Sequence, residues 1–250
     1  MSSRGYAFGD SDLARERLAL VADTFEPTTR AILGEVPPGD RRYVLDIGCG
    51  PGHATALLVE RFPGAYVTGL DASPAMLAEA RARVPQADFV VADVTAPLLL
   101  PAHVVFARLV LGHLADPRRA LENWADALRV GGVMVCEEPV RYRGGDAWFE
   151  RYERAVTGVV ARRGASLWAG DALAGAPEPR DCARVVDRVV EHTVPIARAA
   201  GMFWRNAATW QHETPDGPAL VEHFRRLERD CADGSLVWEI RQTIFVRNRA

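Results

Sequence analysis

The residues best suited to hold a ligand form a glycine-rich turn between an apolar strand pattern and a helix pattern. Residues 44–47 are apolar apart from Asp46, and Gly48, Gly50 and Gly52 follow directly. Because glycine has no Cβ, its backbone can take a tight turn and can approach a ligand closely. The N–H groups at the start of the next helix favour a polar or anionic group. The sequence therefore predicts a ligand-binding loop at the carboxyl end of a strand, where open parallel sheets bind their ligands.

Two further acids follow the next predicted strands. Asp71 ends the strand predicted over 66–71, and Asp93 follows the strand predicted over 88–92. An acid at the end of the second strand can accept hydrogen bonds from both hydroxyls of a ribose, as in dinucleotide-binding folds. A dinucleotide-binding dehydrogenase has the spacing G-x-G-x-x-G, however, and here the third glycine comes one residue earlier. Taken alone, the turn also fits a purely structural role.

The turn and the segments after it resemble the class I S-adenosylmethionine-dependent methyltransferases. The resemblance covers residues 6–138 and includes the glycine turn, Asp71, Asp93 and the fourth-strand region 104–117. It implies an α/β, Rossmann-like fold with S-adenosylmethionine as the cofactor and S-adenosylhomocysteine as the product. Within this superfamily the sequence is most similar to the branch that methylates small molecules. It departs from the family at residues 101–103, where Pro-Ala-His replaces the acid that usually precedes the fourth strand.

The resemblance also implies which residues bind the cofactor. Asp71 would hold the ribose hydroxyls, Asp93 would accept from the adenine amine, and the N–H of Val94 would meet a ring nitrogen. Ala72 and Met76 would pack against the adenine. The complete predicted set is Tyr6, Arg17, Asp46, Gly48, Cys49, Gly50, Gly52, Asp71, Ala72, Met76, Asp93, Val94 and Arg108.

The amino-terminal segment supplies two members of this set. Tyr6 lies in the stretch 6–9, which resembles the part of the small-molecule branch that folds over the cofactor. Arg17 lies in the predicted helix that follows. Its planar guanidinium suits the methionine carboxylate of the cofactor, and a solvent-facing helical arginine is the alternative.

Two residues are candidates for catalysis. Methyl transfer is an in-line displacement for which the protein mainly supplies orientation, and a general base helps only where the acceptor must lose a proton. His113, just past the fourth predicted strand, is a candidate base because imidazole titrates near neutrality. Glu138, next to Glu137 at the end of the strand predicted over 133–137, could orient an acceptor. Both side chains also fit capping or packing roles. No metal site is expected, because the cysteines and histidines lack ligand spacing.

Length and composition fit one α/β domain. The chain has 250 residues, of which 48% are hydrophobic and 25% charged, and a net charge of −3. This charge gives no reason to expect a nucleic-acid partner. The absence of lysine excludes a lysine nucleophile or Schiff base. Because no signal peptide and no apolar run of membrane-spanning length stand out, we predict a cytoplasmic protein with no membrane partner.

Alternating strand and helix patterns predict a seven-stranded, mostly parallel sheet with helices on both faces. The predicted strands cover 42–46, 66–71, 88–92, 104–107 and 133–137, and the predicted helices cover 54–61, 74–83 and 120–128. Before them, residues 12–34 predict one or two amphipathic helices interrupted at Pro27. After residue 138 we predict helices over 145–163, 181–200 and 218–231, a loop over 170–180, a strand over 202–211 and a final antiparallel strand over 236–247.

The expected organisation is one domain with four parts. These are a helical cofactor cover at 1–40, the cofactor-binding core at 41–138, a helical and aromatic substrate lid with a sixth strand at 139–235, and a carboxyl-terminal sheet strand at 236–250. Aromatic residues are frequent in the lid, either to bury a flat ligand or to pack its core. Trp204 and Trp210 are the first candidates for substrate contact.

The sequence therefore predicts an S-adenosylmethionine-dependent methyltransferase for a small-molecule acceptor, with natural-product biosynthesis as the expected setting. The acceptor atom, oxygen, nitrogen or carbon, stays open. A second hypothesis keeps the fold and the cofactor but has no methyl transfer: the cofactor is structural, or it assists a decarboxylation, cyclisation or rearrangement. A third is a non-enzymatic module that binds a protein partner. The amino-terminal helices and residues 236–247 are surfaces through which a homodimer could form.

Overall fold

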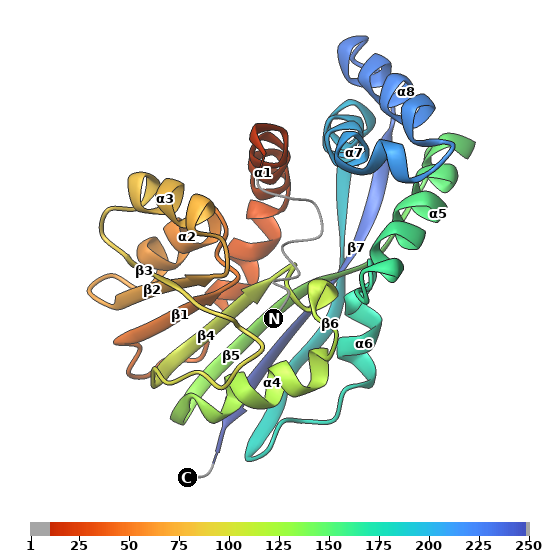
Figure 1. The fold of residues 1–250 in the computed structure, drawn as a ribbon. Coiled ribbons are helices and arrows are strands. Elements are labelled where there is room, and N and C mark those ends of the chain that lie inside the picture. The colour runs from red at the N-terminus through yellow and green to blue at the C-terminus, as the bar shows by residue number, and fades with distance from the viewer. Residues whose placement is uncertain (1–10, 249–250) are drawn as a thin grey trace.

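The glycine turn follows β1, the third strand of a seven-stranded sheet with the order β3-β2-β1-β4-β5-β7-β6 (Figure 1). The computed structural model describes residues 11–248. The strands are β1 (Tyr43–Ile47), β2 (Tyr66–Asp71), β3 (Asp88–Val91), β4 (Ala102–Arg108), β5 (Leu128–Arg143), β6 (Cys182–Pro195) and β7 (Ser235–Arg247). The helices are α1 (Asp12–Gly34), α2 (His53–Arg61), α3 (Pro74–Arg83), α4 (Pro117–Asp126), α5 (Ala147–Arg162), α6 (Ala169–Gly175), α7 (Ile196–Trp210) and α8 (Gly217–Arg229), with short 3₁₀ turns η1 (Leu111–His113) and η2 (Gln211–Glu213).

Strands β1 to β5 are parallel, and β7 is antiparallel to both β5 and β6, so the predicted mostly parallel sheet is confirmed. Helices cover both of its faces. Val104 and Phe106 of β4 pack on one face against α1 and α2, whereas Val105 and Ala107 pack on the other face against Trp124 of α4. Burial on both sides explains why the central strands are continuous apolar runs.

The chain order places a crevice beside the glycine turn. From β1 the chain runs outward through β2 to β3, and it then returns to β4 on the other side of β1. The loops after β1 and β4 consequently leave the sheet in opposite directions. Open α/β sheets bind ligands at such a point, outside the carboxyl ends of the strands.

The lid has a hydrophobic cluster of its own. Helices α5, α7 and α8 lie together on the opposite side of the molecule from α2 and α3 (Figure 1). In this cluster Tyr152 stacks on Phe203 with ring centroids 4.3 Å apart, and both rings pack against Phe224. The carboxyl half of β5 and the amino half of β7 extend from the sheet into this cluster through Tyr142 and Leu236.

Two predictions within the lid are wrong. The helix predicted over 181–200 is strand β6 followed by the start of α7, and the strand predicted over 202–211 lies mainly in α7. Strand β6 is the edge strand of the sheet, where charged side chains are tolerated. The spacing of these charged residues in the sequence is also typical of the exposed face of a helix. Helix α7 buries Phe203, Ala207 and Trp210 at helical spacing. The aromatic residues in this segment favour strands, and the prediction followed them instead of the spacing. In addition, α6 occupies part of the predicted loop over 170–180.

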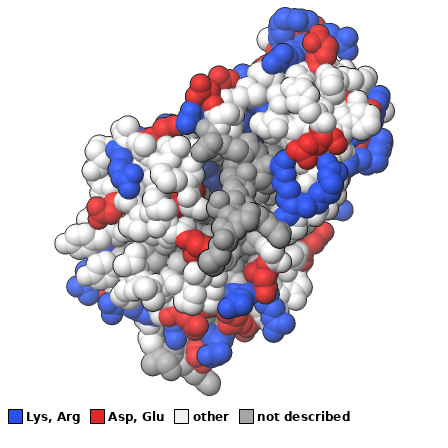
Figure 2. Space-filling model, viewed as in Figure 1, with Lys and Arg blue, Asp and Glu red and all other residues white. Residues whose placement is uncertain are grey.

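The described surface carries charge in small mixed groups. Figure 2 shows basic and acidic side chains close to one another on the viewed face, with basic side chains gathered towards the lid. This mixture agrees with the low net charge of −3. Within residues 11–248, no helix is both long and apolar enough to span a bilayer.

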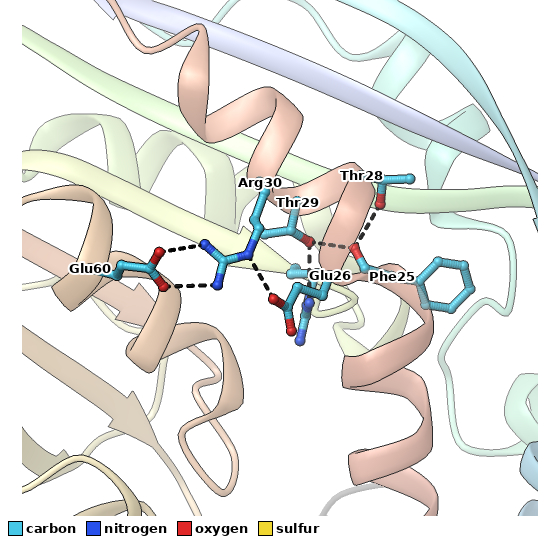
Figure 3. Close-up of polar contacts among 7 residues, drawn as sticks. Phe25, Glu26, Thr28, Thr29, Arg30 and Glu60 are labelled. Carbon is cyan, nitrogen blue, oxygen red and sulfur yellow. Dashed lines mark hydrogen bonds and ion pairs between the residues drawn. The ribbon is translucent and has the colours of Figure 1, made fainter.

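Helix α1 is a single helix that contains Pro27. Proline has no N–H to donate to the carbonyl four residues earlier, so the helical hydrogen-bond ladder is interrupted there. Next to this point, the hydroxyl of Thr28 donates to the carbonyl of Phe25 over 2.9 Å (Figure 3). Past it, Arg30 forms two hydrogen bonds of 2.8 Å with Glu60 of α2. The contact with Glu60 holds the carboxyl half of α1 against α2, and Ile32 and Leu33 of this half share a hydrophobic cluster with strand β4.

The amino half of α1 belongs to the lid. Leu20 and Val21 pack against the lid cluster, and Glu16 pairs with Arg205 of α7 at 3.0 Å. The two halves of one helix are therefore attached to two different hydrophobic clusters.

Candidate active site

The glycine turn has the open geometry of a ligand-binding loop. Gly48 lies against the turn after β4, and a Cβ built on it would stand 2.8 Å from Val110 Cγ2. Gly50 has a left-handed φ of +52° and open space where a Cβ would be. Gly52 begins α2 without a side-chain hydrogen bond to its N–H groups. The backbone of this loop can thus contact a ligand directly.

Two predicted cofactor residues of this segment have side chains that face into the protein. Asp46 is only 1% exposed, and the hydroxyl of Thr55 donates to its carboxylate over 2.6 Å. Burial raises the pKa of Asp46 to about 7, and the hydrogen bond from Thr55 opposes this rise. The thiol of Cys49 is buried in a cluster with Phe89, and burial also raises its pKa. Both side chains therefore pack on the protein side of the turn. Their predicted roles in cofactor binding stay predictions.

Asp71 lies at the carboxyl end of β2, next to the glycine turn. Its carboxylate accepts hydrogen bonds from the N–H of Gly50 over 2.9 Å and from the N–H of Ser73 over 2.8 Å. A carboxylate has further lone pairs, so these two bonds fix its orientation and leave it able to accept from a ligand. Of the two predicted adenine contacts, Ala72 is exposed and Met76 is buried.

Asp93 follows β3, which pairs in parallel with β2. Its carboxylate accepts from the N–H and the hydroxyl of Thr95 over 2.9 and 2.6 Å, and these bonds lower the pKa of Asp93. The carbonyl of Val94 accepts from the indole of Trp124 over 2.9 Å. This bond fixes the peptide that follows the N–H of Val94, the group predicted to meet the adenine ring.

A buried polar network joins α1 to the end of β4 and the middle of β5. Arg108 donates to the hydroxyl of Thr29 over 3.2 Å, and burial lowers the pKa of Arg108. The Thr29 hydroxyl lies 2.5 Å from the carboxylate of Glu137, which also accepts from Gln242 over 2.9 Å. Gln242 donates to the carbonyl of Thr28 as well. Sequence reasoning did not single out Gln242. The one sign of its role in the sequence is that a polar residue interrupts the apolar pattern of the last strand.

A cavity of about 120 Å³ lies beside η1, between the sheet and the lid. Its walls come from α1, the turn after β4, β5, α5, α7 and β7, so segments from most of the chain meet here. The lining residues are Arg17, Val21, Phe25, Leu109, Gly112, His113, Glu138, Pro139, Tyr142, Tyr152, Val160, Ser166, Leu167, Trp168, Met202, Phe203, Asn206 and Trp238.

Glu138 forms part of the cavity wall and also holds the turn after β4. The N–H groups of Val110 and Leu111 both donate to its Oε1, over 2.7 and 2.8 Å. The same turn contains Leu109 with a left-handed φ of +58°, which is uncommon for a residue with a side chain. Burial raises the pKa of Glu138 to about 8, although its hydrogen bonds to the backbone oppose the rise.

His113 and Arg17 line the same cavity. Burial, together with the charge of Arg17, lowers the pKa of His113 to about 4. The imidazole is therefore neutral at pH 7, and it is a weaker base than an exposed histidine. The structure thus brings three predicted site residues, Arg17, His113 and Glu138, into one cavity, whereas Tyr6 lies outside the described residues.

The aromatic residues that line the cavity differ from those singled out in the sequence. Trp204 lies between the guanidinium groups of Arg205 and Arg225, at 4.3 and 4.4 Å from its ring centroid. Trp210 is fully buried in the lid. Neither of them lines the cavity, but Trp168 and Trp238 do. Trp168 and Trp238 come together only because β5 pairs with β7 and because the chain after α5 returns to this place. No local sequence pattern predicts these two long-range features.

The residues present fit an adenosyl cofactor bearing a methionine moiety. The loop at Gly50 has room for a ligand, α2 begins with no side-chain cap, and Asp71 stands oriented at the edge of the crevice. Within residues 11–248, no group of three or more His, Cys, Asp and Glu side chains is placed to hold a metal ion. Fold and crevice together define a Rossmann-like domain of the class I methyltransferase type.

Comparisons with known proteins agree with this class. Residues 44–132 match a family described as a methyltransferase domain. Trans-aconitate 2-methyltransferase of Azoarcus sp. (strain BH72) is 35% identical over 82% of this chain and 75% of its own length. A putative methyltransferase structure from Bacillus halodurans C-125 aligns with a TM-score of 0.61 at 15% identity, covering 89% of this chain and 100% of its own. Haemonchus contortus phosphoethanolamine N-methyltransferase 2, solved with S-adenosylhomocysteine, aligns with a TM-score of 0.53 at 18% identity, over 93% of this chain and 58% of its own.

The chain therefore belongs to the class I S-adenosylmethionine-dependent methyltransferases. It is an enzyme, its cofactor is S-adenosylmethionine, and its acceptor is a small molecule. The hypothesis of a fold that binds the cofactor without methyl transfer is not favoured, because the relative that matches most of the chain is a methyltransferase.

Proposed function

We propose that this enzyme methylates a carboxylate of a small organic acid bound in the cavity beside η1. The observation that carries the proposal is the chemistry of the cavity wall. Arg17 supplies a cation there, and His113, with its pKa lowered to about 4, supplies a neutral imidazole. Glu138 already accepts two backbone hydrogen bonds. These groups suit a nucleophile that is anionic before it binds.

A carboxylate meets this requirement, because it is deprotonated at neutral pH and needs no general base. Arg17 is thereby assigned to the acceptor in place of the methionine carboxylate of the cofactor that the sequence suggested. Arg17 can bind the acceptor carboxylate as an ion pair with a planar donor, and His113 can orient it with a single N–H. The apolar lid would exclude water from the reacting groups. When bound, S-adenosylmethionine supplies a methyl group that is already activated as a sulfonium.

The names of the relatives support an acid as the acceptor. Several proteins similar to this chain, at 32–39% identity, are trans-aconitate 2-methyltransferases, and aconitate is a carboxylic acid. Trans-aconitate is therefore the first acid to test.

The test incubates the enzyme with methyl-labelled S-adenosylmethionine and a panel of carboxylic acids, and then treats the products with alkali. A methyl ester releases its label as methanol, whereas a methyl ether or an N-methyl group keeps it. Alkali-labile label is expected, and Arg17→Gln should raise KM for the acid by about tenfold or more. Product whose label resists alkali, or no product with any acid, would refute carboxyl methylation.

A second candidate function is transfer to a hydroxyl or an amine. The observation in its favour is the pKa of Glu138, which burial raises to about 8 and which therefore suits proton transfer near neutrality. The alkali treatment separates the two candidates.

Three narrower expectations also stay predictions: natural-product biosynthesis as the setting, the cytoplasm as the location, and a homodimer as the assembly. Light scattering of the purified protein tests the last of these.

A further inference from the structure

Besides Phe25 of α1, aromatic rings from five different segments line the acceptor cavity. Tyr142 of β5 lies 5.7 Å from Trp168 and 5.2 Å from Trp238 of β7, measured between ring centroids. Tyr152 of α5 and Phe203 of α7 complete this wall. We call these five residues the aromatic wall.

Hydrogen bonds hold the polar atoms of two residues of this wall on the protein side, whereas the buried indole N–H of Trp238 has no hydrogen-bond partner among the described residues. The hydroxyl of Tyr142 donates to the carbonyl of Phe149 over 2.8 Å, and the indole N–H of Trp168 donates to Glu153 over 3.0 Å. With these atoms engaged, the two side chains can offer ring carbons to a ligand. Such a surface favours a flat apolar group.

The charge of the cavity is suited to a single carboxylate. Among the described residues that line it, Arg17 is the one permanent cation, and Glu138 adds an acidic group. Carboxylates buried without a partner are strongly unfavourable, because they lose water and gain no counter-ion. If an acceptor with three carboxylates bound here, two of its carboxylates would have no cation to pair with among these residues.

The size of the cavity agrees with a small acceptor. Its volume of about 120 Å³ is close to the roughly 150 Å³ of an engineered apolar cavity that binds benzene. One ring or a short unsaturated chain fits this space.

From these observations we infer that the acceptor is a flat, mostly apolar monocarboxylic acid, with its carboxylate at Arg17 and its apolar part on the aromatic wall. This inference rests on the proposed carboxyl methylation and narrows it. It also separates this enzyme from relatives named for trans-aconitate, which carries three carboxylates.

The test compares trans-cinnamate with trans-aconitate, since both are trans-alkenoic acids but carry one and three carboxylates. With labelled cofactor, kcat/KM for cinnamate should exceed that for aconitate by about tenfold or more. Trp168→Ala should lower kcat/KM for cinnamate by about tenfold or more, with little change for aconitate. Trp204→Ala is the matched control, because Trp204 is a lid tryptophan outside the cavity.

A higher kcat/KM for aconitate, or equal losses in the two tryptophan variants, would overturn the inference. Calorimetry with S-adenosylhomocysteine on each variant shows whether the fold and the cofactor site are intact. If no acid of the panel gives alkali-labile product, carboxyl methylation fails as the function. The two acids can then be ranked by their binding to the enzyme loaded with S-adenosylhomocysteine, and tighter binding of aconitate would refute the inference independently.

Discussion

At the scale of single residues, the acidic residues of the site have different structural roles, although in the sequence each of them lies at the end of a predicted strand. Asp46 lies buried beneath the glycine turn, Asp71 orients that turn from its edge, and Glu138 holds the turn after β4. Strand-end position alone made all three candidates for ligand contact. Their hydrogen-bond partners are backbone groups or buried hydroxyls, and only the folded chain brings these within reach.

Asp71→Asn should weaken the binding of S-adenosylhomocysteine by about tenfold or more. The carboxylate accepts from Gly50 and Ser73 with different oxygens, so the amide nitrogen of Asn would face one of these donors and disturb the turn. Calorimetric titration measures the change. Asp93→Asn, at an exposed acid, is the control and should have the smaller effect; the reverse order would contradict the role of Asp71.

Glu138→Gln should change how stability depends on pH. The pKa of Glu138 is raised from 4.5 to about 8 in the folded protein, so its contribution to stability is present below pH 4.5 and is lost as pH rises towards 8. Gln can keep both hydrogen bonds, because both amides donate to Oε1. Relative to the native protein, the variant should therefore gain stability between pH 5 and pH 9. Urea unfolding at both pH values tests this, and a constant difference would refute it.

At the scale of elements, α1 connects the sheet with the lid, and one buried hydroxyl is among its contacts with the sheet. Thr29 lies between Arg108, at the carboxyl end of β4, and Glu137, in the middle of β5. The hydroxyl thus satisfies a carboxylate that is only 1% exposed. A buried acceptor that loses its donor is costly.

Thr29→Val should lower the free energy of unfolding by about 1–3 kcal/mol, since Val keeps the shape and leaves Glu137 without this donor. Thr28→Val is the matched control, because the Thr28 hydroxyl donates only to the carbonyl of Phe25 among the described residues. Denaturant unfolding compares the two variants. Equal losses would show that the contact with Glu137 adds nothing.

The elements also show how far the sequence could predict the structure. Strands β1 to β5 and helices α2 to α4 were predictable, because double-sided burial gives apolar runs and Ser73 and Asp116 mark helix starts. Strand β6 and helix α7 were not predictable. The charged residues of the edge strand have a spacing typical of a helix, and the aromatic residues of the helix are typical of a strand. The acceptor cavity depends on these elements, so its walls could not be placed from the sequence.

At the scale of the whole molecule, the enzyme consists of a sheet that holds the cofactor crevice and a lid that bounds the acceptor cavity. Each part has its own hydrophobic cluster. Any ligand that binds the folded state alone stabilises both parts together, because unfolding would release it.

S-adenosylhomocysteine at 100 times its Kd should therefore raise the stability by about 2.7 kcal/mol, or Tm by roughly 5–10 °C. Thermal unfolding followed by circular dichroism measures this shift. NAD at the same concentration is the control and should leave Tm unchanged. A shift with NAD, or none with S-adenosylhomocysteine, would contradict the assignment of the crevice.

The interrupted helix has a mechanical consequence. Arg17, Val21 and Phe25 line the acceptor cavity from the amino half of α1, whereas the other half is held to the sheet through Thr29 and to α2 through Arg30. Pro27 removes a hydrogen bond where the halves meet. If the lid swings outward with the amino half of α1, we expect the helix to bend at Pro27, where one hydrogen bond of the helical ladder is absent. The size of this bend would then set how far the cavity opens.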